Sequence, residues 1–434
     1  MLAFPGISTD TLRFLRAVRQ RYGPVIQFPV PNPPTFLIDD PHIARQVLLA
    51  YDADFDKDTV QYRALAMVTG DGLLAAANAT WRGQRPVVQP AFHRRVADRL
   101  VADTLAAAQR QVARWERAPA GSVVDIETAM MRVGLEVVGK HLFDADLRAS
   151  APQLATATLD ALDAVIASVR PPWSALQGLP TPARRRYQRA MVELDDAVAA
   201  LVADRLRRGK AGQGEDLLGL LLAGYPDDPL SIRNQIITFL VAGHETVASA
   251  LTWTLGLLAH HGTEQQLLQR EVDELLGDRD AELADFDRLP VVRACFDEAL
   301  RLYPPAWIIT RSASRPMVLG SREIPGGALI IISPWLLHRD PNRWPLPDAF
   351  LPQRFAGRPG AYARSATTRA EYLPFGTGQR LCIGRDFALV EACIVLATLG
   401  RRFTFLPDSA KLPSVDPLVT LRPTGGLRLR LVPR

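Results

Sequence analysis

The stretch FGTGQRLCIG, from Phe375 to Gly384, decides how this 434-residue chain folds. It places Cys382, one of only three cysteines, at the end of a glycine-containing turn. The sequence that follows, GRDFALVEACIVLATLGRRF, predicts a helix whose first turn comes directly after the cysteine. Because backbone N–H groups at a helix N-terminus favour a thiolate, we expect them to lower the pKa of Cys382.

Three familiar kinds of cysteine or glycine site do not fit the spacing of this turn. Gly376 and Gly378 suggest a dinucleotide fingerprint, but leucine occupies the third glycine position and no strand leads into the turn. Covalent c-type haem attachment needs C-x-x-C-H, and a zinc site needs further cysteines or histidines at ligand spacing. A buried structural cysteine would leave the glycines and Arg380 unexplained. A thiolate ligand to haem iron accounts for them, because glycines let backbone approach a flat cofactor and Arg380 can meet its carboxylate.

Composition limits the class of protein. Hydrophobic residues make up 48% and charged residues 22% of the chain, which is typical of a large globular protein. The net charge of +5 is spread thinly, without the aromatic and arginine interleaving expected for nucleic-acid binding. Three cysteines indicate a reducing compartment. The N-terminal sequence has no apolar run long enough for a signal peptide or membrane anchor, so we expect a cytoplasmic protein.

The order of elements predicts a mainly α fold with small β-sheets. PVIQFPV and TFLIDD read as strands separated by the turn PNPP, and residues 81–208 are mostly helical. The segment Ser231–His261 is apolar on all sides and lacks proline, which predicts a long central helix. Its interior His244 and Glu245 argue against a membrane span. Alternating strands follow Pro305, and no linker divides the chain, so we expect one domain over residues 1–434.

The central segment holds AGHET, from Ala242 to Thr246. A hydroxyl beside a carboxylate can relay protons, and Gly243 would leave room for a ligand against the helix. The zinc-protease pattern H-E-x-x-H is excluded because residue 248 is alanine. A buried polar pair satisfied within the core remains the alternative interpretation.

Three further stretches contain charged residues whose spacing could serve a binding or structural role. Glu298 and Arg301 share one helix face, an arrangement that most often forms a surface ion pair. The stretch FLPQRF follows some fifty residues on, and WRGQR lies near residue 81. Taken singly, a surface arginine or a core tryptophan would account for each of these.

In combination, these elements closely resemble the cytochrome P450 family. Its haem signature F-x-x-G-x-R-x-C-x-G is filled by Phe375, Gly378, Arg380, Cys382 and Gly384. The resemblance implies a P450 fold whose long central helix crosses haem b, with Cys382 as the iron ligand. It assigns the following residues to cofactor binding: Trp81, Arg85, Ala242, Arg311, Phe375, Gly376, Arg380, Cys382 and Gly384. It also implies a buried structural triad of Glu298, Arg301 and Arg354 that locks the cysteine loop.

The resemblance further implies a monooxygenase that inserts one oxygen atom of O2 into a lipophilic small molecule. Hydroxylation of a terpenoid, polyketide or fatty acid in secondary metabolism is the expected reaction, with Glu245 and Thr246 delivering protons. The substrate should meet five apolar side chains: Leu74, Ala242, Ala306, Ile308 and Val419. A peroxide-driven haem oxidase or peroxygenase and a non-catalytic haem-binding protein are the alternatives.

The resemblance also implies partners. Since fifty residues follow Gly384, we expect no fused reductase, and electrons should pass from NAD(P)H through a separate ferredoxin reductase and ferredoxin. The protein should be a monomer that binds no nucleic acid. Arginines expected to dock ferredoxin on the cysteine side are Arg82, Arg94, Arg95 and Arg385.

Overall fold

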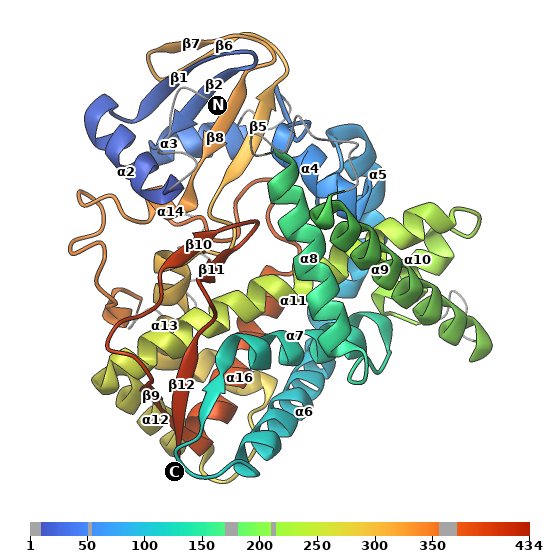
Figure 1. The fold of residues 1–434 in the computed structure, drawn as a ribbon, viewed down its shortest axis with the longest axis vertical. Helices are drawn as coiled ribbons and strands as arrows, with labels where there is room; N and C mark the ends of the chain where they lie inside the picture. The colour runs from blue at the N-terminus through green and yellow to red at the C-terminus, as the bar shows by residue number, and fades with distance from the viewer. Residues whose placement is uncertain (1–9, 51–53, 170–180, 210–213, 356–370) are drawn as a thin grey trace.

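Helices form most of the part of the chain that the structure describes, and four small sheets accompany them (Figure 1). The computed structural model describes residues 10–50, 54–169, 181–209, 214–355 and 371–434. Its α-helices are α2 (Thr11–Tyr22), α3 (Pro41–Arg45), α4 (Val60–Thr69), α5 (Asn78–Val88), α6 (Ala97–Glu116), α7 (Ile126–Phe143), α8 (Ala151–Val169), α9 (Pro182–Arg207), α10 (Leu217–Gly224), α11 (Pro229–His260), α12 (Gly262–Leu276), α13 (Pro290–Leu302), α14 (Pro334–Leu337) and α16 (Arg385–Arg402). Short 3₁₀-helices are η3 (Gln89–Phe92), η4 (Arg94–Val96), η6 (Leu283–Arg288) and η7 (Pro352–Arg354), and η1 (Gln46–Ala50) is a π-helix.

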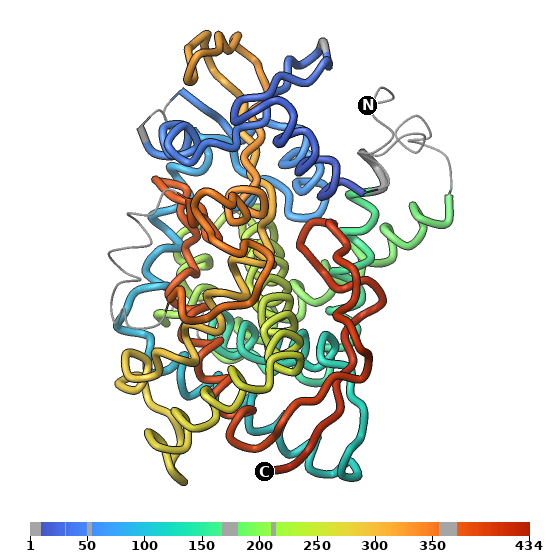
Figure 2. The backbone as a smooth tube through the Cα atoms, turned by 90° about the vertical axis from the view of Figure 1, so that its left-hand side faces the viewer, coloured from blue at the N-terminus to red at the C-terminus, as the bar shows by residue number. Residues whose placement is uncertain are grey.

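The largest sheet joins strands near the N-terminus to two strands from residues 309–332. Its order is β1-β2-β8-β5-β3, from β1 (Val25–Pro31), β2 (Pro34–Ile38), β8 (Leu329–Ile332), β5 (Ile309–Ala313) and β3 (Phe55–Asp56). β2 and β8 run parallel, and the other pairs are antiparallel. The smaller sheets pair β6 (Met317–Leu319) with β7 (Arg322–Ile324), β10 (Val415–Pro417) with β11 (Leu421–Pro423), and β12 (Arg428–Pro433) with β4 (Val123–Asp125) and β9 (Phe403–Pro407). In Figure 2 the blue and orange strands meet at the top, and the red C-terminal strands descend along one side.

Helix α11 forms the centre of the core. Asp228 caps it by accepting a hydrogen bond from the backbone of Ser231, and proline fills the first helical position. The helix is long and apolar enough to cross a membrane by length and composition, but 83% of its apolar window is buried inside the protein. It is therefore a core helix.

Small residues bring α7 close to α11. A Cβ on Gly134 would lie 3.1 Å from the carbonyl oxygen of His244, and one on Gly243 would lie 2.9 Å from a methyl group of Val138. The expectation that Gly243 makes room for a ligand is therefore incomplete, because its missing side chain is first of all required by the contact with α7.

The predicted fold class is confirmed, with differences at element boundaries. The two N-terminal strands, the central helix and the helix after Cys382 all form. The central helix begins at Pro229 rather than Ser231, because Asp228 supplies its cap. Helix α3, which Asp40 caps, continues as the π-helix η1 from Gln46.

Candidate active site

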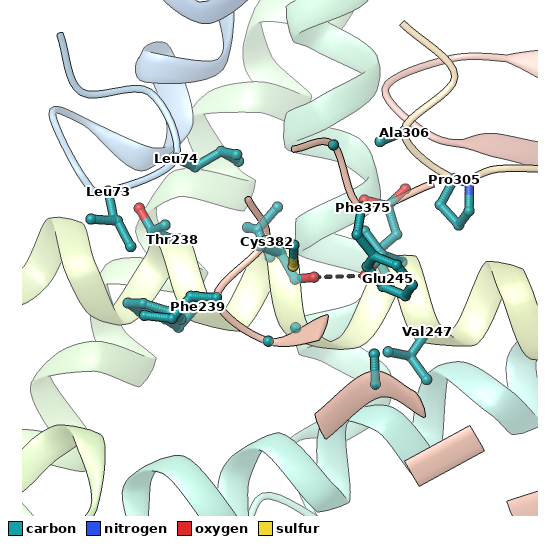
Figure 3. A pocket seen from close by; sticks show the side chains of 18 of the residues that line it. Leu73, Leu74, Thr238, Phe239, Glu245, Val247, Pro305, Ala306, Phe375 and Cys382 are labelled. Atoms are coloured by element: carbon teal, nitrogen blue, oxygen red, sulfur yellow. Dashed lines mark hydrogen bonds between the residues drawn. The ribbon is translucent and has the colours of Figure 1, made fainter. Parts of the chain in front are cut away.

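A cavity of about 340 Å³ lies between α11, α5, the cysteine loop and the turn between β10 and β11. In Figure 3 the labelled side chains of Leu74, Glu245, Ala306 and Cys382 surround it, and α11 crosses the view. Every residue that the sequence assigned to catalysis, cofactor or substrate lines this cavity: Leu74, Trp81, Arg85, Ala242, Glu245, Thr246, Ala306, Ile308, Arg311, Phe375, Gly376, Arg380, Cys382, Gly384 and Val419.

The cysteine loop, residues 373–384, is a compact turn closed by backbone hydrogen bonds. The N–H of Cys382 donates to the carbonyl of Phe375 at 3.1 Å. Gly376 and Gly378 have φ values of 69° and 76°, which favour glycine. A Cβ on Gly378 would lie 1.9 Å from the carbonyl oxygen of Leu48, so the loop packs on backbone that no larger residue could approach.

Cys382 is the exposed cysteine of the three, whereas Cys295 and Cys393 are buried in the core. It lies deep in the protein, and its exposed surface faces the cavity. Burial raises the pKa of the Cys382 thiol, and the backbone of Gly384 and the charge of Arg85 only partly oppose this rise. The expected lowering of this pKa is therefore wrong for the protein alone, because desolvation outweighs the helix N-terminus.

Three arginines and one tryptophan surround the part of the cavity next to the cysteine loop. Arg380 donates to the carbonyl of Ala76 at 3.0 Å and to the side-chain oxygen of Asn78 at 2.7 Å. Its guanidinium lies 4.4 Å from the centre of the Trp81 ring.

The other two arginines differ in burial. Arg311 is buried and donates to the carbonyl of Thr310 at 2.9 Å. Burial lowers the pKa of Arg85, although the charge of Cys382 favours its charged form. A flat cofactor with two carboxylates and an iron atom matches this donor set, because a cysteine sulfur faces a cavity lined by arginines.

Glu245 and Thr246 project from α11 into the cavity with different partners. Glu245 accepts a hydrogen bond of 2.7 Å from the hydroxyl of Thr420, and burial raises the pKa of this carboxyl to about 7. The hydroxyl of Thr246 donates to the carbonyl of Ala242 at 2.8 Å. A carboxyl group with a pKa near neutrality can both hold and release a proton.

Glu298, Arg301 and Arg354 come together as the sequence predicted, and the first two are fully buried. Arg301 donates twice to Glu298, at 2.7 and 2.8 Å, and Arg354 donates once, at 3.2 Å. Arg301 also donates to the carbonyls of His338, Pro347 and Ala349. The alternative of a surface ion pair is therefore excluded.

His338 is a buried residue that the sequence analysis missed. Its Nε2 accepts a hydrogen bond of 2.8 Å from the N–H of Leu373, at the start of the cysteine loop. Its Nδ1 must then carry the proton and donate to the carbonyl of Arg301 at 3.2 Å. Burial lowers the pKa of His338 well below its ordinary value, so the ring stays neutral. His338 thus connects the end of α13 to the cysteine loop.

The arginines predicted to dock a partner differ in exposure. Arg82, Arg94 and Arg95 are exposed, and Arg95 lies 3.4 Å from Glu215. Arg385 is only partly exposed and is bonded to Asp386 at 2.7 Å. A Cβ on Gly384 would lie 3.9 Å from the ring of Phe92, which places η3 beside the cysteine loop, and η4 follows η3 in the chain.

The fold and the site define a haem-thiolate protein. A long core helix carries an acid and a hydroxyl over a cavity, and a glycine-containing loop presents a cysteine to that cavity. Among the described residues, no group of three histidine, cysteine or acidic side chains offers a metal site of another kind.

Comparison with known proteins agrees with the class of protein that the fold and the site indicate. The family described as Cytochrome P450 matches residues 3–429. Cyclooctatin synthase of Streptomyces melanosporofaciens is 32% identical over 98% of this chain and 91% of its own length. Pentalenene oxygenase of Streptomyces avermitilis is 32% identical over 95% of this chain and 91% of its own length. The crystal structure of CYP175A1 from Thermus thermophilus superimposes with a TM-score of 0.80 and 34% identity, covering 98% of this chain and 96% of that one.

The chain belongs to the cytochrome P450 family. It is a monooxygenase, an oxidoreductase whose family members bind haem and take electrons from redox partners.

Proposed function

We propose that this monooxygenase hydroxylates a lipophilic terpenoid, and that Cys382 is the iron ligand of its haem b. The observation that carries the proposal is the cavity, which brings Cys382, the Glu245–Thr246 pair and an apolar lining together. Two of the similar proteins, cyclooctatin synthase and pentalenene oxygenase, are named for cyclooctatin and pentalenene. These names favour a terpenoid over the polyketide or fatty acid that the sequence also allowed.

Bound haem would supply an iron centre at which dioxygen is bound and reduced. Arg85, Arg311 and Arg380 would pair with its propionates, and Trp81 would support Arg380 through ring stacking. Glu298, Arg301 and Arg354 would support the loop that presents Cys382 indirectly, since Arg301 donates to the carbonyl of His338 and His338 accepts from the N–H of Leu373. Each of these groups would bind the haem or orient a residue that binds it.

The remaining residues handle protons and substrate. Glu245 can hold and release a proton near neutral pH, since its pKa is about 7, and Thr246 offers a hydroxyl on the next residue of the helix. The apolar side chains, Leu74, Ala242, Ala306, Ile308 and Val419, exclude water and orient the substrate. In this proposal α11 supplies the proton-carrying groups and Ala242, and the other four substrate-facing side chains come from segments outside α11.

Electrons would come from NAD(P)H through a ferredoxin reductase and a ferredoxin, in the cytoplasm, to a monomeric single-domain protein over residues 1–434. Support for a ferredoxin comes from the exposed Arg82, Arg94 and Arg95 beside the cysteine loop. An acidic partner docks on such a surface through complementary charge.

A spectral binding screen of the purified haem protein tests the proposal. Terpenoids, polyketides and fatty acids are titrated, and a ligand that displaces water from the iron shifts the Soret band. The hit is then turned over with NADPH, ferredoxin and ferredoxin reductase, or with hydrogen peroxide alone. We expect hydroxylated product from a terpenoid in the first system. Product from peroxide alone would favour the peroxygenase, and the absence of any shift or product would favour a non-catalytic haem protein.

A further inference from the structure

The turn between β10 and β11, residues 418–421, is fixed to the protein at both ends. At one end, Trp307 donates through its ring nitrogen to the carbonyl of Leu418 at 2.9 Å. At the other end, the carbonyl of Leu421 accepts from Ser249 at 2.7 Å and from the ring nitrogen of Trp253 at 3.0 Å. Both of these donors belong to α11, so the turn has a fixed position relative to the central helix.

This rigid turn carries Thr420 to the carboxyl group of Glu245. Thr420 is buried, and its hydroxyl donates to Oε1 of Glu245 at 2.7 Å. Among the contributions that favour the carboxylate form of Glu245, this hydrogen bond is the largest. Oε1 is occupied by a donor, so a proton held by this carboxyl group belongs on Oε2.

The charged groups around Glu245 act on it through their charge, whereas Thr420 hydrogen-bonds it directly. Arg422, from β11, favours the carboxylate, while Asp163 from α8 and Glu127 from α7 oppose it. Arg422 acts on Glu245 through its charge, and its hydrogen bond goes to Glu127 at 2.7 Å. Thr246 uses its hydroxyl on the carbonyl of Ala242. A direct hydrogen bond therefore reaches Glu245 from Thr420 rather than from these neighbours.

We propose that Thr420 is a positioning residue for Glu245: its hydroxyl fixes Oε1 on the side of the turn and leaves Oε2 to hold the proton that Glu245 delivers into the cavity. This inference rests on the proposed role of Glu245 as a proton donor. The neighbouring Val419 and Ala306 line the same cavity, and the N–H of Leu421 donates to the carbonyl of Pro305 at 3.3 Å. A substrate that contacts Val419 therefore lies next to the turn that positions the acid.

Infrared spectroscopy of the purified haem protein tests this directly. The carbonyl stretch of protonated Glu245 is identified as the band that disappears in Glu245→Gln. In Thr420→Val, which keeps the side-chain shape, we expect this band to move to higher wavenumber because its carbonyl oxygen loses a hydrogen bond. We also expect its titration midpoint to rise by about one to two pH units, the size expected for a lost bond to a charged group. Thr420→Ser should restore both values.

Thr398→Val is the matched control. Thr398 is equally a buried threonine, on α16, and its hydroxyl donates to the carbonyl of Ile394 at 2.7 Å. This variant should leave the Glu245 band unchanged. If Thr420→Val does not accumulate, Thr420→Cys replaces it, because a thiol keeps the volume but is a weak donor.

The two possible failures are distinguishable. A Glu245 band that stays in place in Thr420→Val, or that moves equally in Thr398→Val, overturns the positioning role. Loss of the red-shifted Soret band of the reduced carbon monoxide complex in wild type would instead contradict the haem-thiolate assignment.

Discussion

At the scale of single residues, the protein alone does not favour the thiolate form of Cys382. Burial raises the pKa of its thiol, and Arg85 and the backbone of Gly384 compensate only in part. A metal ion displaces the thiol proton outright, so the thiolate is expected to form together with cofactor binding. The cavity around Cys382 is therefore formed while the thiol is still protonated, and the thiolate is expected only with the bound cofactor.

We predict that Cys382→Ala abolishes the red-shifted Soret band of the reduced carbon monoxide complex. The band requires a thiolate on the iron, and alanine removes it without adding bulk. Cys393→Ala is the control, because Cys393 is buried in α16 and burial raises the pKa of its thiol to about 12. A band that survives in Cys382→Ala would show that another group binds the iron.

Thr246→Ala should keep haem and oxygen consumption but lower the product formed per electron. We expect a loss of up to about a hundredfold, the lower end of what positioned proton transfer contributes. Thr254→Ala removes the same kind of bond on the same helix, from a hydroxyl to the carbonyl of Ala250 at 2.7 Å. If Thr246→Ala and Thr254→Ala form the same amount of product per electron, the hydroxyl of Thr246 takes no part in proton delivery.

Glu245 gives a prediction for stability against pH. Its pKa is about 7 in the folded protein and 4.5 in a free chain, so the folded state binds more protons between these values. Stability from this group is full below about pH 4.5 and declines as the pH rises through 7. Glu245→Gln removes the loss, so its free energy of unfolding should exceed that of wild type at pH 8 by on the order of 3 kcal/mol.

The comparison is made by chemical denaturation of both proteins between pH 5 and pH 8. Other buried acids, such as Asp39 and Glu391, are present in both proteins, so the difference isolates Glu245. A difference that does not grow with pH would contradict the burial of its charge.

At the scale of elements, the cysteine loop depends on the segments that hold it from behind. His338 joins the N–H of Leu373 to the end of α13, and Arg301 of α13 also donates to the carbonyl of His338 at 2.8 Å. Losing His338 leaves two buried backbone groups unpaired, each costing about 1–3 kcal/mol. The loop should then lose its position before the fold is lost.

We predict that His338→Leu shifts part of the reduced carbon monoxide band away from its thiolate position, and that His338→Gln retains more of it. Gln265→Leu is the matched control. Gln265 is a buried side chain that joins α11 and β9 through bonds to Leu258 and Phe405, far from the loop in sequence. Both leucine variants should lower the melting temperature. Equal spectra in the two variants would reduce His338 to a general role in stability.

The sequence could predict elements whose signal is local. The central helix is a long apolar run without proline, and the cysteine loop has glycines where φ is positive. For the triad, the sequence showed only the spacing of Glu298 and Arg301. The burial of Glu298 could not be predicted locally, because it depends on segments some fifty residues away. His338 and Thr420 carried no local signal, because each acts through a backbone or side chain distant in sequence. Gly378 was recognised, but its contact with Leu48 is tertiary.

At the scale of the whole molecule, charge is distributed unevenly around the site. The 51 basic residues exceed the 46 acidic ones, and many arginines pair with neighbouring acids. On η4, beside the cysteine loop, Arg94 is exposed, and Arg82 is exposed on α5. Arg85 and Arg380 line the cavity instead, where we propose that they pair with the cofactor. This surface is where a negatively charged electron donor would come closest to Cys382.

We predict that Arg94→Glu slows first-electron transfer from an acidic ferredoxin by about tenfold at low salt, because steering of the encounter is lost. The effect should shrink as salt is raised, since exposed charges are screened within about 10 Å at 0.1 M. Arg21→Glu on α2, an exposed arginine across the molecule from α5 (Figure 1), makes the same change of charge and should leave the rate nearly unchanged. Stopped-flow reduction against ionic strength measures all three proteins. Equal slowing by both reversals would mean that net charge alone steers the partner, and a rate insensitive to salt and to Arg94 would point to an apolar contact beside the cysteine loop.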